Sequence, residues 1–257
     1  MIHATAIIDP SAKIHSSCIV GPYCIIGPDV ELGENCELMA NVIIHGPAHI
    51  GSHNRFFPFC AIGMEPQDTT FAGEKTKLRI GDHNTFREYV TINRGTTKGG
   101  GVTAVGSHVL LLAYAHIGHD CFVGDHAMLI NAATLAGHVT VEEWAVIGAF
   151  SAVHQFCRVG AHAYIGGDTM CTKDVLPFST VVSPRDARAY GLNAVGLERR
   201  GFSKERIRKI HRAFKVLLNS KLNTTQALEQ LRAEADRGED VDMLVRFIEE
   251  SERGVIK

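Results

Sequence analysis

The chain has 257 residues, of which 45% are apolar and 21% charged, a balance that is ordinary for a globular protein. Its formal net charge of -2 provides no field of one sign that would draw the whole molecule to nucleic acid or to an anionic membrane. The longest apolar run, Val109 to Ala115, is far shorter than the roughly 20 residues that cross a bilayer. Because no basic-then-apolar leader follows Met1, we expect a cytoplasmic protein without nucleic-acid partners or integral membrane contact.

An apolar residue recurs at every sixth position through most of the first 171 residues. The series runs unbroken from Ile2 to Ile62, resumes in phase at Ile80, and continues after a slip of one residue from Val105 to Cys171. A fixed period of this kind indicates a solenoid. Each hexapeptide repeat is expected to form a short strand and a corner, and three repeats to close a triangular coil whose strands pair in parallel with the next coil.

Glycine and cysteine occupy fixed slots of the repeat. Glycine often follows the repeated apolar residue, as at Gly33 and Gly118, and we expect it there because the corner needs unusual backbone angles. The chain has seven cysteines but no Cys-x-x-Cys pair. Six of them lie four residues after the apolar position and are interpreted as small buried hydrophobic residues: Cys18, Cys24, Cys36, Cys60, Cys121 and Cys157.

The repeat is interrupted twice and ends before the last part of the chain. Residues of about 63–79 and 97–103 are expected to be loops that leave corners of the prism, and loops on a rigid scaffold often carry function. The repeat fades after Cys171. We therefore expect a parallel β-helix over residues 1–183 and a small α-helical domain over residues 184–257.

Apolar spacing in the last part of the chain is helical. Ser203 is available to cap a first helix, whose apolar face contains Ile207, Ile210, Phe214, Leu217 and Leu218. Thr224 is expected to cap a second helix, and a third is expected to end near Gly254.

Most of the fourteen histidines lie at corners where a polar side chain is solvated, but four are predicted to share one edge of the prism. One coil of eighteen residues beyond His119 lands next to His138, two coils land next to His154, and His116 lies just before. Imidazoles in a column suit either a metal site or proton transfer. Because no two histidines have the five-residue spacing of zinc-binding hexapeptide-repeat proteins, we expect no metal and interpret His119, beside Asp120, as a general base.

Several stretches of the chain resemble one enzyme family along its whole length. The most specific are His116-Ile117-Gly118-His119-Asp120-Cys121, Asn131 to Val139 and Ala152 to Cys157, with further matches in Gly63 to Asp68 and Gly191 to Phe202. These motifs are similar to those of the acyl-carrier-protein-dependent UDP-N-acetylglucosamine O-acyltransferases, which start lipid A biosynthesis. The resemblance implies a left-handed β-helix and a homotrimer with active sites in grooves between neighbouring prisms.

The resemblance also implies a role for each matching residue. His119 matches the general base that deprotonates the sugar 3-hydroxyl, Asp120 its orienting partner, and the backbone N–H of Gly137 the oxyanion donor. The acyl donor is carried on the phosphopantetheine of acyl carrier protein, and no other cofactor is implied. Residues that match substrate-binding positions are Asp68 (on the adjacent subunit's loop), His116, His138, His154, Gln155, Gly167, Asn193, Arg199 and Arg200.

Three positions bear on which substrates are used. Gly167 matches the residue that sets acyl length, and a glycine there implies an open groove for a long hydroxyacyl chain, unless Gly166-Gly167 is only a tight corner. Where many family members have lysine two residues after the loop aspartate, this chain has Thr70, and where they have histidine before Arg-Gly-Thr it has Asn93. A 3-amino sugar nucleotide, acylated to an amide, is therefore an alternative acceptor.

A basic cluster follows the substrate motifs. Between Arg199 and Lys215 there is one acid, Glu205, and eight cations: Arg199, Arg200, Lys204, Arg206, Arg208, Lys209, Arg212 and Lys215. The cluster is either a solvated helix face or a docking surface for acyl carrier protein, a strongly acidic partner.

Three other functions fit less well. The related N-acyltransferases carry an additional N-terminal uridine-binding domain, for which a repeat that begins at Ile2 leaves no room. Acetyl-CoA-dependent sugar acetyltransferases share the prism but not the two histidine motifs. A scaffold without catalysis does not explain a histidine column, a protruding loop and a basic cluster on one chain.

Overall fold

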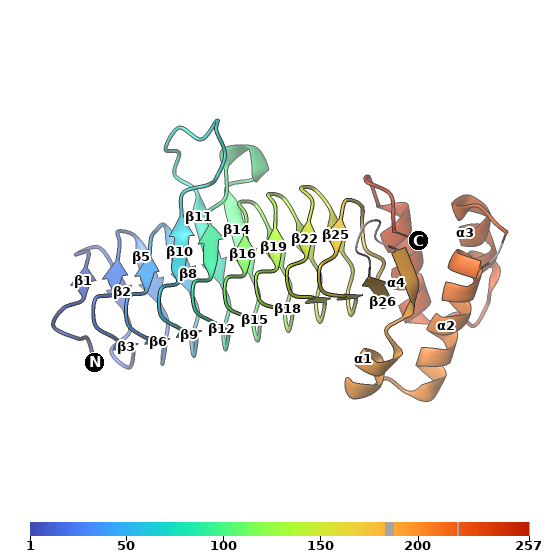
Figure 1. Ribbon diagram of the computed structural model, residues 1–257, viewed down its shortest axis with the longest axis horizontal. Coiled ribbons are helices and arrows are strands. Elements are labelled where there is room, and N and C mark those ends of the chain that lie inside the picture. Colours follow the sequence, from blue (N-terminus) through green and yellow to red (C-terminus); the bar gives the residue numbers. More distant parts are fainter. Residues whose placement is uncertain (183–187, 220, 257) are drawn as a thin grey trace.

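The computed structural model describes residues 1–182, 188–219 and 221–256. Its first part is a left-handed parallel β-helix, a long triangular prism, and its last part is a group of helices at the end of the prism opposite the N-terminus (Figure 1). The fold class expected from the repeat is confirmed. The domain boundary expected between residues 183 and 184 lies outside the described residues.

Each face of the prism is one sheet of short strands. The first sheet contains β1 (Ile7–Ile8), β4 (Ile25–Ile26), β7 (Ile43–Ile44), β10 (Ala61–Met64), β13 (Thr91–Asn93), β16 (His116–Ile117), β19 (Thr134–Leu135), β22 (Ala152–Val153) and β25 (Met170–Cys171). The second contains β2 (Lys13–Ile14), β5 (Val30–Leu32), β8 (Ala48–Ile50), β11 (Lys77–Ile80), β14 (Val102–Val105), β17 (Phe122–Val123), β20 (Thr140–Val141) and β23 (Arg158–Val159). The third contains β3 (Ile19–Val20), β6 (Glu37–Leu38), β9 (Arg55–Phe56), β12 (Thr85–Phe86), β15 (Leu110–Leu111), β18 (Met128–Leu129), β21 (Val146–Ile147), β24 (Tyr164–Ile165), β26 (Ser179–Val182) and the antiparallel β27 (Arg188–Leu192).

The repeated apolar residues form the core of the prism. Ile117 pairs with Leu135 and Leu135 with Val153, each eighteen residues further along the chain, and all three are buried. The seven cysteines are also buried and unpaired, as expected, and burial raises the pKa of the Cys121 thiol to about 12. The cysteines therefore act as small hydrophobic residues that fill the corners.

The glycines that follow the repeated apolar residue are required for space. A Cβ on Gly33 would lie 2.7 Å from the carbonyl carbon of Gly51 on the next coil, and one on Gly118 would lie 2.9 Å from that of Ala136. Positive φ angles occur instead two residues later, as at Asp120, where φ is 59°. The expectation that the corner needs unusual backbone angles at these glycines holds at Gly63, where φ is 76°, but is wrong at Gly33 and Gly118, where glycine is needed because the neighbouring coil approaches too closely for a side chain.

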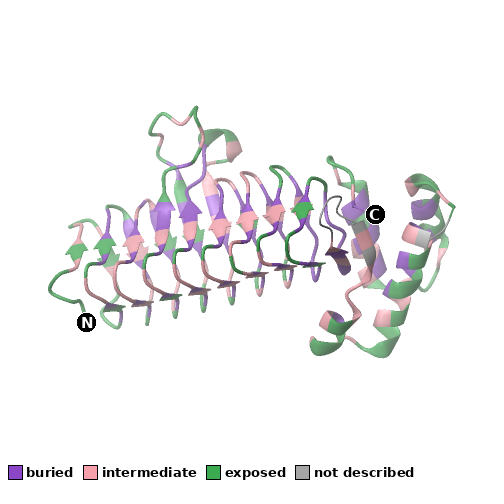
Figure 2. Ribbon diagram, in the orientation of Figure 1, coloured by how far each residue is buried: buried purple, intermediate pink, exposed green. Residues whose placement is uncertain are grey.

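Two loops leave the edge where the first sheet passes into the second, and their outer parts are mostly exposed (Figures 1 and 2). They span residues 65–76, between β10 and β11, and residues 94–101, between β13 and β14. The first loop is shorter than the predicted 63–79, because β10 and β11 extend into its base, whereas the second begins and ends before the predicted 97–103, because β14 already starts at Val102. The second loop contains a short 3-10 helix, η1 (Thr97–Gly99).

A ladder of aromatic rings follows the next edge, between the second and third sheets. Neighbouring rings stack with centroids 4.0 to 6.3 Å apart, in the order His53, His83, His108, His126, Trp144 and His162. His53, His83 and His108 are exposed, as expected of corner histidines, but the coil spacing also brings their rings into face-to-face contact, and His162 is buried.

The helical part contains α1 (Ala194–Arg199), α2 (Lys204–Asn219), α3 (Thr224–Ala233) and α4 (Glu239–Glu249). Ser203 caps α2 as predicted, accepting a hydrogen bond from the Arg206 N–H at 3.2 Å. Thr224 does not cap α3, because Asn223 takes that place through a capping box with Gln226. The helix α1 was not predicted, and α4 ends before Gly254.

The helices pack on the end of the prism around one apolar core, which joins Phe178 to Leu197, Phe214, Leu231 and Phe247. Among the described residues, no helix is both long enough and apolar enough to span a bilayer.

The last histidine of the ladder predicts a pH-dependent stability. Burial, followed by the nearby charge of Arg200, lowers the pKa of His162 from 6.5 to about 4. Between pH 6.5 and pH 4, His162 is protonated in the unfolded chain but stays neutral in the folded chain. The free energy of unfolding therefore decreases by about 3 kcal/mol as the pH falls from 6.5 towards 4.

The variant His162→Phe keeps the flat ring and removes this titration. We expect its melting temperature to fall less than that of the unchanged protein between about pH 7 and pH 4.5. Thermal denaturation followed by circular dichroism measures this difference, and parallel curves for the two proteins would contradict the assignment.

Candidate active site

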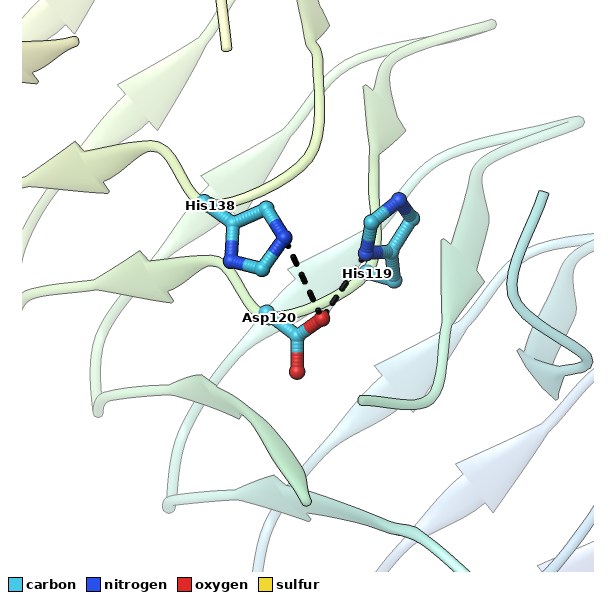
Figure 3. Close-up of side chains that lie close together, drawn as sticks. All are labelled: His119, Asp120 and His138. Carbon is cyan, nitrogen blue, oxygen red and sulfur yellow. Dashed lines mark hydrogen bonds and ion pairs between the residues drawn. The ribbon is translucent and has the colours of Figure 1, made fainter. Parts of the chain in front are cut away.

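His119, Asp120 and His138 meet at the edge from which the two loops leave (Figure 3). The Nδ1 atom of His119 lies 2.8 Å from Oδ2 of Asp120, and Nε2 of His138 lies 3.7 Å from the same oxygen. Since a carboxylate oxygen only accepts, Nδ1 of His119 carries the proton and its Nε2 is left as the acceptor. The His119 side chain is 15% exposed and that of Asp120 0%, so the imidazole reaches solvent while the carboxylate is shielded.

Gly137 makes room for this imidazole. A Cβ on Gly137 would lie 2.6 Å from Cε1 and 2.7 Å from Nε2 of His119, so a side chain at this position would displace the imidazole. The N–H groups of Ala136 and His138 bond to carbonyls of neighbouring coils, but within the described residues the N–H of Gly137 has no partner. An unpaired donor therefore lies beside the acceptor nitrogen of His119.

His154 lies further along the same edge, but His116, expected to share it, lies in strand β16 of the first sheet, because its register pairs it with Thr91 and Thr134. His116 is hydrogen-bonded to Thr91, with 2.7 Å between Nδ1 and Oγ1, and burial lowers its pKa, as does the charge of His119. His154 and Gln155 are exposed one coil beyond His138. The sequence does not predict that the guanidinium of Arg253 lies 3.2 Å from Nδ1 of His154, because these residues are 99 positions apart.

The two loops join above the site. Oδ1 of Asp68 accepts hydrogen bonds from the Thr70 N–H at 2.8 Å and from its Oγ1 at 2.9 Å, and these bonds lower the pKa of Asp68. Lys98 and His119 lower it further through their charge. Lys98 donates to Oγ1 of Thr70 at 2.7 Å. Asp68, expected to act from the adjacent subunit's loop, is held within its own loop by Thr70, and Lys98 brings a cation that sequence reasoning missed.

Asn93 is buried beneath these loops. Its side chain donates to the carbonyl of Glu65 at 2.7 Å, while Oδ1 has no hydrogen-bond partner in the described part of the chain. With 4% of its surface exposed, Asn93 holds the base of the first loop.

Two expected nucleotide-binding residues lie on a different edge. Asn193 caps α1 through the Gly196 N–H and donates to the carbonyl of His162 at 3.0 Å. Arg200 donates to the carbonyl of Trp144 at 2.8 Å and stacks over its indole. His162 and Trp144 belong to the aromatic ladder, so one chain does not bring these two residues together with the histidine column.

Gly167 lies on the third edge, between β24 and β25. A Cβ there would meet only the backbone of Ala149, with the carbonyl oxygen at 3.3 Å. Gly167 is therefore open on its outer side, and no contact within the chain requires a glycine as strictly as at Gly137.

A metal ion is a possible occupant of the histidine site, since ligand atoms of His119, Asp120 and His138 lie within 4.8 Å of one another. However, Oδ2 of Asp120 already accepts from His119 and from Oγ1 of Thr96 at 2.7 Å, and Oδ1 accepts from the Thr96 N–H at 2.7 Å. A cation would have to displace these bonds. The arrangement favours proton transfer over metal binding.

The basic cluster is only partly free. Arg206 is paired with Asp240 at 2.8 Å and Lys209 with Asp236 at 2.7 Å. Arg206 is exposed despite its ion pair, and the exposed cations of the cluster without an ion pair among the described residues are Arg199, Lys204, Arg208, Arg212 and Lys215. A groove of about 470 Å³ lies beside Lys204 and Arg208, with Leu192 and Ile207 among its apolar lining residues and Lys204, Arg208 and His211 among its polar ones.

Comparison with known proteins identifies the family. Residues 174–256 match the family model described as "Udp N-acetylglucosamine O-acyltransferase; Domain 2". The chain is 46% identical to the acyl-[acyl-carrier-protein]–UDP-N-acetylglucosamine O-acyltransferases of Stenotrophomonas maltophilia strain R551-3 and Xylella fastidiosa, covering 100% of this chain and 97% and 98% of theirs.

Solved structures agree. UDP-N-acetylglucosamine acyltransferase from Francisella novicida is 41% identical with a TM-score of 0.97, covering 100% of this chain and 94% of the other. The Bacteroides fragilis enzyme is 39% identical with a TM-score of 0.96 and full coverage of both chains. The chain belongs to the acyl-[acyl-carrier-protein]–UDP-N-acetylglucosamine O-acyltransferase family.

Proposed function

We propose that this protein transfers a 3-hydroxyacyl chain from acyl carrier protein to the 3-position of UDP-N-acetylglucosamine, the first step of lipid A biosynthesis. The proposal rests on two groups that lie side by side: the acceptor nitrogen Nε2 of His119 and the backbone N–H of Gly137 on the next coil, which has no hydrogen-bond partner among the described residues. Acyl transfer needs both groups, a base for the nucleophile and a donor for the oxyanion. The names of its relatives support this choice of donor and acceptor.

The reaction follows from this arrangement. Nε2 of His119 removes the proton of the sugar 3-hydroxyl as its oxygen attacks the thioester carbonyl carbon, and Asp120 stabilises the resulting imidazolium. The N–H of Gly137 donates to the oxyanion of the tetrahedral intermediate. Collapse of that intermediate breaks the carbon–sulfur bond, and the phosphopantetheine thiolate leaves with the proton held by His119. No metal takes part.

The acceptor is a hydroxyl or an amine at the sugar 3-position. The side-chain amide of Asn93 is hydrogen-bonded to the carbonyl of Glu65 at the base of the first loop, and the hydroxyl of Thr70 is hydrogen-bonded to Lys98. These two residues favour a test of UDP-N-acetylglucosamine against its 3-amino analogue.

We infer that the protein is a homotrimer with active sites between subunits, because the residues expected to bind the substrate lie on two different edges of the prism. The histidine column lies between the first and second sheets, whereas Asn193 and Arg200 contact residues between the second and third. A sugar nucleotide that touches both sets is bound by two neighbouring chains. His138, His154, Gln155 and Asp68 then hold the sugar end, and Asn193, Arg199 and Arg200 the nucleotide end.

The proposed base predicts the effect of His119→Ala. Loss of the imidazole should lower kcat by roughly 10²- to 10⁴-fold, because water, a much weaker base, must then remove the proton of the sugar 3-hydroxyl. The assay offers hydroxyacyl carrier proteins of several lengths with UDP-N-acetylglucosamine or its 3-amino analogue, and identifies products by mass spectrometry. A folded His119→Ala variant with near-full turnover, or no acylated product from either acceptor with the unchanged protein, would overturn the proposed function.

The proposed oxyanion donor predicts the effect of Gly137→Ala. The new methyl group would overlap the imidazole of His119, so both the base and the neighbouring N–H should be displaced, lowering kcat by about 10²- to 10³-fold. Gly167→Ala is a matched control, since its methyl group meets only Ala149, and it should change the preferred acyl length more than turnover. Equal kcat losses in the two variants would contradict this division of roles.

We also propose that the exposed cations of α2 dock acyl carrier protein beside the groove of Leu192 and Ile207. Replacing Lys204, Arg208 and Arg212 with glutamate should raise the KM for acyl carrier protein about tenfold at low salt, because attraction becomes repulsion. Lys209 is left unchanged, since it is paired with Asp236. An acyl-pantetheine donor without the protein is the control, and its KM should not change. A docking role is excluded if both donors respond alike.

A further inference from the structure

The carboxylate of Asp120 is held by one residue of the second loop. Thr96 donates its backbone N–H to Oδ1 and its hydroxyl to Oδ2, both at 2.7 Å. Asp120 in turn donates its own N–H to Oγ1 of Thr103 at 2.8 Å. Thr96 therefore fixes both carboxylate oxygens of Asp120, and Thr103 fixes its backbone. The Asp120 side chain is 0% exposed.

The loop also packs directly against this carboxylate. Thr96 caps η1, and its hydroxyl accepts the Gly99 N–H at 3.2 Å while it donates to Asp120. A Cβ on Gly99 would lie 2.1 Å from the carboxyl carbon of Asp120, so η1 packs directly on the carboxylate. Hydrogen bonds from one side and backbone packing from another define a single rotamer of Asp120.

We propose that Thr96 is a positioning residue of the acyl-transfer reaction, acting on His119 through Asp120. The inference rests on the proposed function, in which His119 is the base. By fixing both oxygens, Thr96 directs Oδ2 at Nδ1 of His119, and this keeps the proton on Nδ1 and the acceptor lone pair on Nε2. Without the hydroxyl, the carboxylate keeps one hydrogen bond from the loop and can turn away from the imidazole.

The same loop reaches the acceptor side of the site. Lys98, two residues after Thr96, bonds to Thr70 of the first loop, which holds Asp68. Thr96 thus connects the base to the loops that close over it. Its role lies in orientation and makes no contact with substrate, so its loss should lower kcat and leave both KM values nearly unchanged.

The test compares three threonine variants in steady-state kinetics and thermal denaturation. Thr96→Val should lower kcat roughly 10- to 100-fold, as expected when the partner that orients a reacting side chain is lost. Thr96→Ser, which keeps the hydroxyl, should restore most of the activity. Thr76→Val is the matched control, because Thr76 is a buried threonine at the base of the loops whose hydroxyl has no partner within the described chain, and its activity should not change.

A double-mutant cycle separates positioning from general damage to the fold. If Thr96 acts through Asp120, Thr96→Val should cost little further activity in an Asp120→Asn background. Multiplicative losses in the double variant, or a Thr96→Val enzyme with unchanged kcat, would overturn the inference. Failure of the proposed function is a different result, because it requires either activity that survives His119→Ala or no acylated product from the unchanged protein, whereas the inference can fail while His119 remains essential.

Discussion

Parallel hydrogen bonds between coils hold the edge histidines and Gly137 of the candidate site in register. The strand pair of Ile117 and Leu135, followed by that of Leu135 and Val153, repeats each corner after eighteen residues. The N–H of His138 donates to the carbonyl of His119 at 2.9 Å, so the two imidazoles sit on successive corners of one edge. Because side chains alternate between core and surface along a strand, a slip of one residue would bury the polar column and expose the apolar one. The packing of the apolar core therefore sets the strand register, and the register sets the relative positions of the edge histidines.

The rigid prism and its two loops divide the chemistry between them. The coils supply His119 and the N–H of Gly137, whose spacing is set by the backbone, and such preorganised groups need no rearrangement as charge develops. The loops supply the environment of the base, since Thr96 fixes the carboxylate and Lys98 joins one loop to the other. The edge that carries Asn193 and Arg200 is separate. This separation explains why the proposed reaction requires neighbouring chains.

Sequence reasoning succeeds where the period of eighteen is uninterrupted and fails where it is not. His119, Gly137 and Gln155 are aligned by counting alone, because no insertion lies between them. Thr96 and Lys98 could not be placed in this way, since the loops lengthen the step between paired strands to 30 residues from Ala61 to Thr91 and to 25 from Thr91 to His116. The capping of α3 was also missed, because Asn223 and Thr224 both suit a cap and only the reciprocal bond of Gln226 decides between them. Roles proposed for substrate-binding residues remain predictions.

A crystal structure of the protein with UDP-N-acetylglucosamine bound tests the central claim most directly, since it locates the acceptor relative to the base. The proposed mechanism predicts that the sugar 3-hydroxyl oxygen lies about 3 Å from Nε2 of His119 and that Nδ1 keeps its hydrogen bond to Asp120. A sugar bound along another edge of the prism, or one whose 3-hydroxyl faces away from His119, would contradict it.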